Sequence, residues 1–169
     1  SSDGPFDRSS DATLSALAPS SGSLSPSFAS ATTSYTTSVG NSTSSITITP
    51  TVTQANATIT VNGTSVTSGS ASGAISLNVG SNTITVNVTA QDGTTKTYTI
   101  TVTRNSNVAT LSALTLSSGS LSPSFTSATE TYTASVANST SSITITPTVT
   151  QANATTAQFI GATGTTPFT

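Results

Sequence analysis

The chain has 169 residues, a formal net charge of −2 and only 5% charged residues, while Ser and Thr fill 74 positions. Cys, His, Met and Trp are absent, so soft and borderline metal sites and Cys–His or Ser–His catalysis are excluded. Three basic residues cannot build the positive surface that nucleic acid requires. No apolar run is long enough for a helix that spans a bilayer. We therefore expect a protein that is not an enzyme and that holds no cofactor or metal.

The most informative feature is an internal repeat with an offset of 97 residues. Residues 12–58 recur as residues 109–155 with 40 identities in 47 positions. After Thr155 the match stops, and nothing corresponds to residues 59–104. The sequence thus predicts a leader (1–11), a complete repeat (12–104), a linker (105–108), the first half of a second repeat (109–155) and a divergent tail (156–169).

Within the complete repeat, apolar side chains alternate with hydroxyl side chains. The alternation runs through residues 46–52, then 84–88, and then 98–102. A period of two is typical of strands with one buried and one exposed face. Pro50 and its counterpart Pro147 fall inside such patterns, which predicts edge strands or bulges there because proline cannot donate a backbone hydrogen bond.

Turn signals separate these strands. Asn62-Gly63 predicts a tight hairpin and Asp92-Gly93 a second one. About seven short strands are expected in residues 12–104, and about three in residues 109–155. This number and spacing favour an all-β fold, an antiparallel immunoglobulin-like β-sandwich with one complete repeat plus a half repeat.

Several blocks resemble the cadherin-like β-sandwich repeats of bacterial surface and secreted proteins. They are Leu14-Ser-Ala-Leu17, residues 21–28, Gly80-Ser-Asn-Thr-Ile84 and the closing block, residues 88–102. The resemblance implies an immunoglobulin-like fold, an extracellular or cell-surface location and a spacer role, with no catalytic residue. The clustered carboxylates that calcium needs are missing, because the five acidic residues are scattered.

Two kinds of candidate site follow from the residues. Asn-X-Ser/Thr sequences make six asparagines candidate N-glycosylation sites, although this number is close to chance in a chain so rich in Ser and Thr. O-linked sugars on the exposed threonines are the other candidate modification. The six asparagines are Asn41, Asn56, Asn62, Asn87, Asn138 and Asn153.

The half repeat carries the functional hypothesis. Without partner strands it should expose its apolar side chains, and open strand edges recruit other chains. We expect self-assembly into a filament or stalk, with strands donated between subunits. The alternative is a spacer or carbohydrate-binding adhesin module from a longer array, using loops 63–73 and 90–94. The expected assembly segment consists of Tyr132, Ile143, Ile145, Val149, Phe159 and Ile160.

Overall fold

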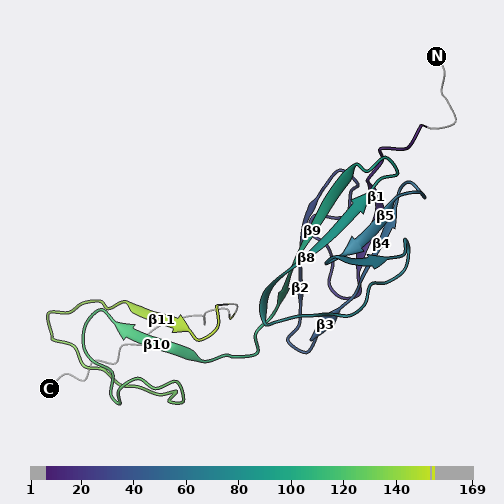
Figure 1. The fold of residues 1–169 in the computed structure, drawn as a ribbon. Coiled ribbons are helices and arrows are strands. Elements are labelled where there is room, and N and C mark those ends of the chain that lie inside the picture. The colour runs from purple at the N-terminus through teal and green to yellow at the C-terminus, as the bar shows by residue number, and fades with distance from the viewer. Residues whose placement is uncertain (1–6, 153, 155–169) are drawn as a thin grey trace. The chain divides into compact units, whose positions relative to one another are not determined.

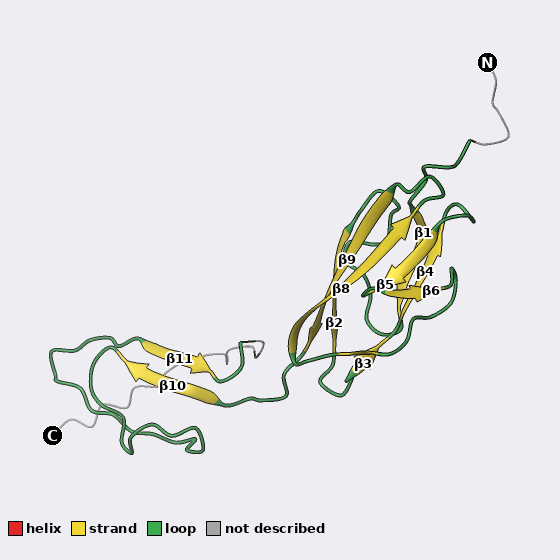
Figure 2. Ribbon diagram, in the orientation of Figure 1, coloured by secondary structure: helices red, strands yellow, loops and turns green. Residues whose placement is uncertain are grey.

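The computed structural model describes residues 7–152 and 154, and all its regular elements in these residues are strands (Figures 1 and 2). The all-β class predicted from the alternation is therefore confirmed. The chain divides into two compact units, residues 1–106 (unit 1) and residues 107–169 (unit 2). No helix in the described part is long and apolar enough to cross a membrane.

The described residues of unit 1, 7–106, contain nine strands in three sheets. This is two more than the sequence predicted, and the two shortest strands, β3 and β7, have only two residues each. The largest sheet has the order β2-β9-β8-β5-β6. It comprises β2 (Ser34–Val39), β5 (Thr58–Val61), β6 (Thr64–Val66), β8 (Gly80–Thr89) and β9 (Thr95–Arg104). The two other sheets pair β1 (Leu14–Pro19) with β4 (Ile48–Val52), and β3 (Ser45–Ile46) with β7 (Ile75–Ser76).

One pairing is an exception to the antiparallel arrangement that the sequence predicted for the sandwich. β2 lies parallel to β9, from Ser34 opposite Thr99 to Val39 opposite Arg104. A parallel pair needs a long crossover between its strands. Here the intervening chain supplies it, because β2 and β9 come from opposite halves of the repeat. The other pairings in the unit are antiparallel.

The hairpin predicted at Asn62-Gly63 is confirmed. β5 and β6 pair antiparallel across these two residues, with φ of 47° at Asn62 and 81° at Gly63. Positive φ at both central residues is the requirement of a type I′ turn, which Asn-Gly meets with least strain. The turn places Val61 opposite Thr64 and leaves the short β6 at one edge of the large sheet.

Pro50 lies in an edge strand, as its sequence position predicted. β4 pairs with β1 alone, and the register of this pair shifts between Leu14 and Ala16. The outer edge of β4 is covered by residues 67–73, which we call the strap. The Pro50 carbonyl accepts a hydrogen bond from the Gly69 N–H, at 2.8 Å, and the Ile48 carbonyl accepts one from the Ser72 N–H, also at 2.8 Å. The strap thus donates hydrogen bonds to backbone carbonyls on the outer edge of β4, where Pro50 has no N–H group to donate.

The core of unit 1 is one cluster between β1–β4 and the large sheet, to which both halves of the repeat contribute similarly. Strand alternation places these side chains on inward faces, while Thr and Ser occupy most outward positions. The first half supplies Ala12, Leu14, Leu17, Tyr35, Val39, Ile46, Ile48, Val52 and Ala57, and the second half supplies Ile59, Val61, Leu77, Ile84, Val86, Val88, Ala90, Tyr98, Ile100 and Val102.

The inward side of β2 contains one polar side chain. Thr37 is buried between Tyr35 and Val39, and its hydroxyl has no hydrogen-bond partner in the described part of the chain. Burying an unpaired hydroxyl costs about 1–3 kcal/mol. Its counterpart in the second copy is Ala134, so the repeat does not require a hydroxyl there.

We predict that Thr37→Val raises the free energy of unfolding of unit 1 by about 1 kcal/mol. Valine keeps the branched shape and removes the polar group. Urea denaturation followed by tyrosine fluorescence measures the change. Thr37→Ser keeps the hydroxyl and loses a methyl group, so it should destabilise. A Thr37→Val chain less stable than the parent would show that the hydroxyl has a partner in solution.

Candidate functional site

Unit 2 contains two strands in its described residues, β10 (Leu111–Leu116) and β11 (Ile145–Val149), which pair antiparallel. Three strands were expected in residues 109–155. The counterpart of β2, residues 131–136, contains only an isolated bridge between Thr133 and Ser122. In unit 1 this segment is a strand because β9 pairs with it, and unit 2 has no counterpart of β9 among its described residues.

The first half of the repeat nevertheless has much of the same local structure in unit 2 as in unit 1. β10 and β11 repeat the register of β1 and β4, including the shift between Leu111 and Ala113. The rings of Phe125 and Tyr132 stack with centroids 6.0 Å apart, as those of Phe28 and Tyr35 do. The Tyr132 hydroxyl donates to the Thr126 carbonyl at 2.7 Å. Contacts within the first half are therefore sufficient to form this part of the fold.

The two units differ sharply in the exposure of equivalent side chains. Ile46 and Ile48 are 1% and 0% exposed in unit 1, whereas Ile143 and Ile145 are 41% and 40% exposed. Val136 is 43% exposed, against 4% for Val39. The sequences around these residues are nearly identical. In unit 1 the second half of the repeat covers them, whereas no described residue of unit 2 occupies the corresponding position. We call the surface formed by Leu111, Leu114, Tyr132, Val136, Ile143, Ile145 and Val149 the open face.

The residues expected to mediate assembly fall on this face where the structure describes them. Ile143 and Ile145 are exposed, while Tyr132 and Val149 are half-buried. Phe159 and Ile160 lie outside the described residues. Val136 also belongs to this face and was missed, although its offset of 97 residues from the buried Val39 was a sufficient signal.

Unit 2 also has a groove that shares Leu114 with the open face. The groove, of about 370 Å³, is lined by Leu114, Leu116, Leu121 and Phe125 together with small polar residues. These four residues come from β10 and from the loop that follows it. The apolar side chains on the surface of unit 2 thus include residues of the loop after β10. Large exposed apolar surfaces on proteins mark interaction sites.

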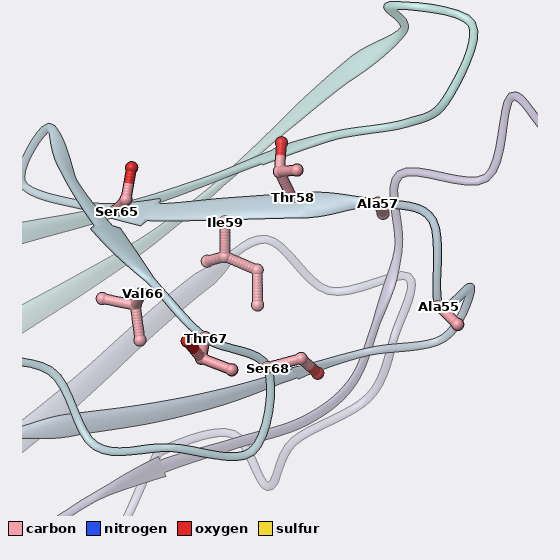
Figure 3. A pocket seen from close by; sticks show the side chains of 8 residues that line it. All are labelled: Ala55, Ala57, Thr58, Ile59, Ser65, Val66, Thr67 and Ser68. Carbon is pink, nitrogen blue, oxygen red and sulfur yellow. The ribbon is translucent and has the colours of Figure 1, made fainter.

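A groove in unit 1 is a separate candidate for small ligands. It has a volume of about 380 Å³ and lies between the β5–β6 hairpin and the start of the strap (Figure 3). Ile59 and Val66 point into the space between these segments, while Thr58 and Ser65 point away (Figure 3). No aromatic or charged side chain lines it. Ligand pockets normally place a few polar groups among aromatic and apolar ones, so this groove has little means of orienting a sugar.

The candidate glycosylation sites occupy different environments. Asn56, Asn62 and Asn138 are exposed. Asn41 is half-buried and donates from Nδ2 to the Asn105 carbonyl at 3.0 Å. Asn87 is half-buried in β8, where its Oδ1 accepts from the Thr97 hydroxyl at 2.7 Å. Asn153 lies outside the described residues.

Lys96 is the only lysine and is half-buried. Its ammonium donates to the Ser30 carbonyl at 3.1 Å and lies 5.5 Å from the centroid of the Tyr98 ring. The charge thus lies over an aromatic ring and also reaches a polar group. This geometry gives Lys96 a role in attaching the loop before β2 to β9.

Two carboxylates are tied to turns by hydrogen bonds. The side-chain and backbone groups of Thr13 donate to Asp11, at 2.6 and 2.8 Å, and lower the pKa of that carboxyl below 3.8. The Thr94 N–H donates to Asp92 at 2.8 Å and lowers its pKa in the same direction. Asp92 is exposed, whereas Asp11 is half-buried. Among the described residues, no three acidic, His or Cys side chains lie close enough to hold a metal ion.

We predict that the stability of unit 1 is nearly constant from about pH 5 to pH 9, because the chain has no His or Cys. A lowered folded-state pKa stabilises the fold above the unfolded pKa. That contribution should be lost as the pH falls below 3.8, the ordinary value for Asp11 and Asp92, and through the lowered pKa of each carboxyl in the folded state. Urea midpoints at pH 3, 5, 7 and 9 measure this. Asp92→Asn should reduce the loss of stability between pH 5 and pH 3. An unchanged loss would contradict the role given to Asp92.

One family model matches both copies of the repeat. Its description is "Cadherin-like beta sandwich domain", and it matches residues 10–105 and 111–167. The second match continues past Thr155, where direct comparison with the first copy finds no counterpart. No curated protein matches the chain.

Proposed function

Since the chain belongs to the cadherin-like beta sandwich domain family, we propose that it is a structural subunit of an extracellular filament, fibre or stalk. Domains of this family are generally extracellular or surface-associated structural modules. Unit 1 provides a rigid spacer, because its apolar side chains form one closed core. Unit 2 joins the subunit to its neighbour through the open face.

One observation carries this proposal. Side chains that are buried in unit 1 have equivalents in unit 2 that are exposed, although the sequences around them are nearly identical. Val136, Ile143 and Ile145 are each about two-fifths exposed. Apolar area contributes about 25 cal/mol per Å² when it is removed from water. A surface of this kind therefore favours association between chains. A contact that joins different surfaces of successive copies does not close, and it produces a filament.

The low charge of the chain supports dense packing of subunits. Eight charged side chains in 169 residues give little repulsion between neighbours. Association should then depend only weakly on ionic strength. The rival function, carbohydrate binding, has less support because the groove beside β6 has no aromatic lining.

The test compares the assembly of four chains by sedimentation velocity and electron microscopy. The parent chain should associate with increasing concentration and form regular filaments. A chain cut after Arg104, and an Ile143→Asp/Ile145→Asp chain, should both remain monomeric. Val79→Asp is the matched control, because Val79 is a similarly exposed apolar residue of unit 1, at 37%, and it should not prevent assembly.

Monomers from all four chains would overturn the filament role. The chain would then be a spacer module, and a glycan-array signal abolished by substitutions in loops 63–73 or 90–94 would establish the adhesin alternative instead.

A further inference from the structure

We propose that the open face of unit 2 is a docking surface for a further copy of the second half of this same repeat, which it binds even when that half is supplied as a separate segment. The occupant is a segment with the pattern of residues 58–104, in which Ile, Val and Tyr alternate with Thr and Asn. This proposal rests on the joining role given to the open face above, and it identifies what completes that face.

Unit 1 shows how such a segment fits. Ile84, Val86 and Val88 of β8, with Ile100 and Val102 of β9, are fully buried in the same cluster as the first-half side chains. The Tyr98 hydroxyl accepts from the Leu14 N–H at 3.0 Å and donates to the Ser30 carbonyl at 2.8 Å. The second half therefore covers the apolar face of the first and also anchors its first strand.

Unit 2 presents the first half already in the receptive form. Its strand register, its stacked Phe125–Tyr132 pair and its Ser122–Thr133 bridge all match those of unit 1. A preformed surface loses little conformational entropy when a partner binds. The segment that must still become ordered as a strand is 131–136, and the donated counterpart of β9 would pair with it in parallel.

The outer edge of β11 is a second point of contact. In unit 1 the strap belongs to the second half and bonds to the carbonyls of Ile48 and Pro50. The corresponding residues are Ile145 and Pro147. Within the described residues, no segment of unit 2 makes the equivalent bonds. A donated second half would bring its own strap to this edge, and a β-hairpin alone would not.

Exchange of residues 58–104 between copies does not close the open face. These 169 residues contain two first halves, 12–57 and 109–154, and one segment with the pattern of the second half, 58–104, which unit 1 uses. If a neighbouring copy donated that segment, its own first half would be left open, with no net gain in buried area. Closure of unit 2 therefore requires a further segment of this pattern in addition to residues 58–104.

The experiment adds an unlabelled peptide of residues 58–104, carried on a solubility tag, to the isotope-labelled full chain. We expect a complex of one peptide per chain. Amides of residues 131–136 and 143–149 should become protected from hydrogen exchange, while the resonances of unit 1 stay unchanged. The peptide should also reduce any self-association of the chain, because it covers the open face.

Two matched peptides test the pattern. Val86→Asp/Ile100→Asp places charges on the inward face and should bind at least about a hundredfold more weakly, since a buried unpaired charge is costly. Thr83→Asp/Thr97→Asp adds the same charge at two exposed positions and should bind like the parent. As a check that unit 2 is competent to close, a chain with residues 58–104 in place of 155–169 should bury Tyr132.

Failure of the parent peptide to bind, equal binding by the two charged peptides, or protection of 131–136 before any peptide is added would each overturn the inference. The results also separate it from the proposed function. Filaments without peptide binding would leave the structural role standing and reject this occupant. Peptide binding by a chain that never self-associates would support this occupant and reject the filament role.

Discussion

Ile48→Ala should lower the free energy of unfolding of unit 1 by about 3–4 kcal/mol, within the range for truncating a buried isoleucine. Ile48 is fully buried in β4 between the two layers, so the truncation removes apolar contacts and leaves a cavity. Urea denaturation of the full chain, followed by tyrosine fluorescence, measures the loss because Tyr35 and Tyr98 are buried in the same cluster.

The repeat provides the control for this prediction. Ile145 occupies the equivalent position in an identical stretch of sequence but is 40% exposed. Ile145→Ala should therefore change the stability of the monomer by less than about 1 kcal/mol. Equal losses from the two substitutions would mean that unit 2 is closed in solution, and the open face would then not exist.

Added second-half peptide should change this comparison. Once the peptide completes unit 2, Ile145 becomes a core residue, and Ile145→Ala should weaken peptide binding at least about tenfold, which corresponds to 1.4 kcal/mol. The same side chain is thus expected to have a small effect on folding and a large effect on binding.

The strands of unit 1 could be predicted because their pattern is local. Alternation through residues 84–88 and 98–102 marks β8 and β9, and Asn62-Gly63 fixes the hairpin between β5 and β6. A period of two and a turn requirement depend on neighbouring residues only. The family resemblance read from the closing block is also confirmed.

The features that sequence reasoning missed depend on contacts distant in the chain. Nothing in Ser34–Val39 indicates that β2 pairs in parallel with β9, because register and direction are set by the assembled sheets. Residues 131–136 share four of six residues with β2 yet form no strand in unit 2. The same local pattern therefore gives different secondary structure according to whether a partner strand is present. The open face was inferable because it follows from counting halves of the repeat.

Gly22→Ala should lower the free energy of unfolding of unit 1 by about 2–5 kcal/mol, from two separate causes. Gly22 has φ of +76°, where a non-glycine residue costs about 1–2 kcal/mol. A Cβ added at this position would also overlap the Thr37 hydroxyl and come within 2.9 Å of the Ser38 carbonyl oxygen, and such overpacking typically costs 1–3 kcal/mol.

Gly63→Ala separates the two causes. Gly63 has φ of +81°, but no atom lies within 4 Å of an added Cβ, so only the backbone cost of about 1 kcal/mol should appear. Thr37→Ala, the residue that the second copy carries, should recover part of the loss in the Gly22→Ala chain because it removes the hydroxyl. It should not recover all of it, since the Ser38 carbonyl remains. If Gly22→Ala and Gly63→Ala cost the same, the close approach of Gly22 to β2 would make no contribution, and the loop before β2 would be held by the stacked Phe28–Tyr35 pair instead.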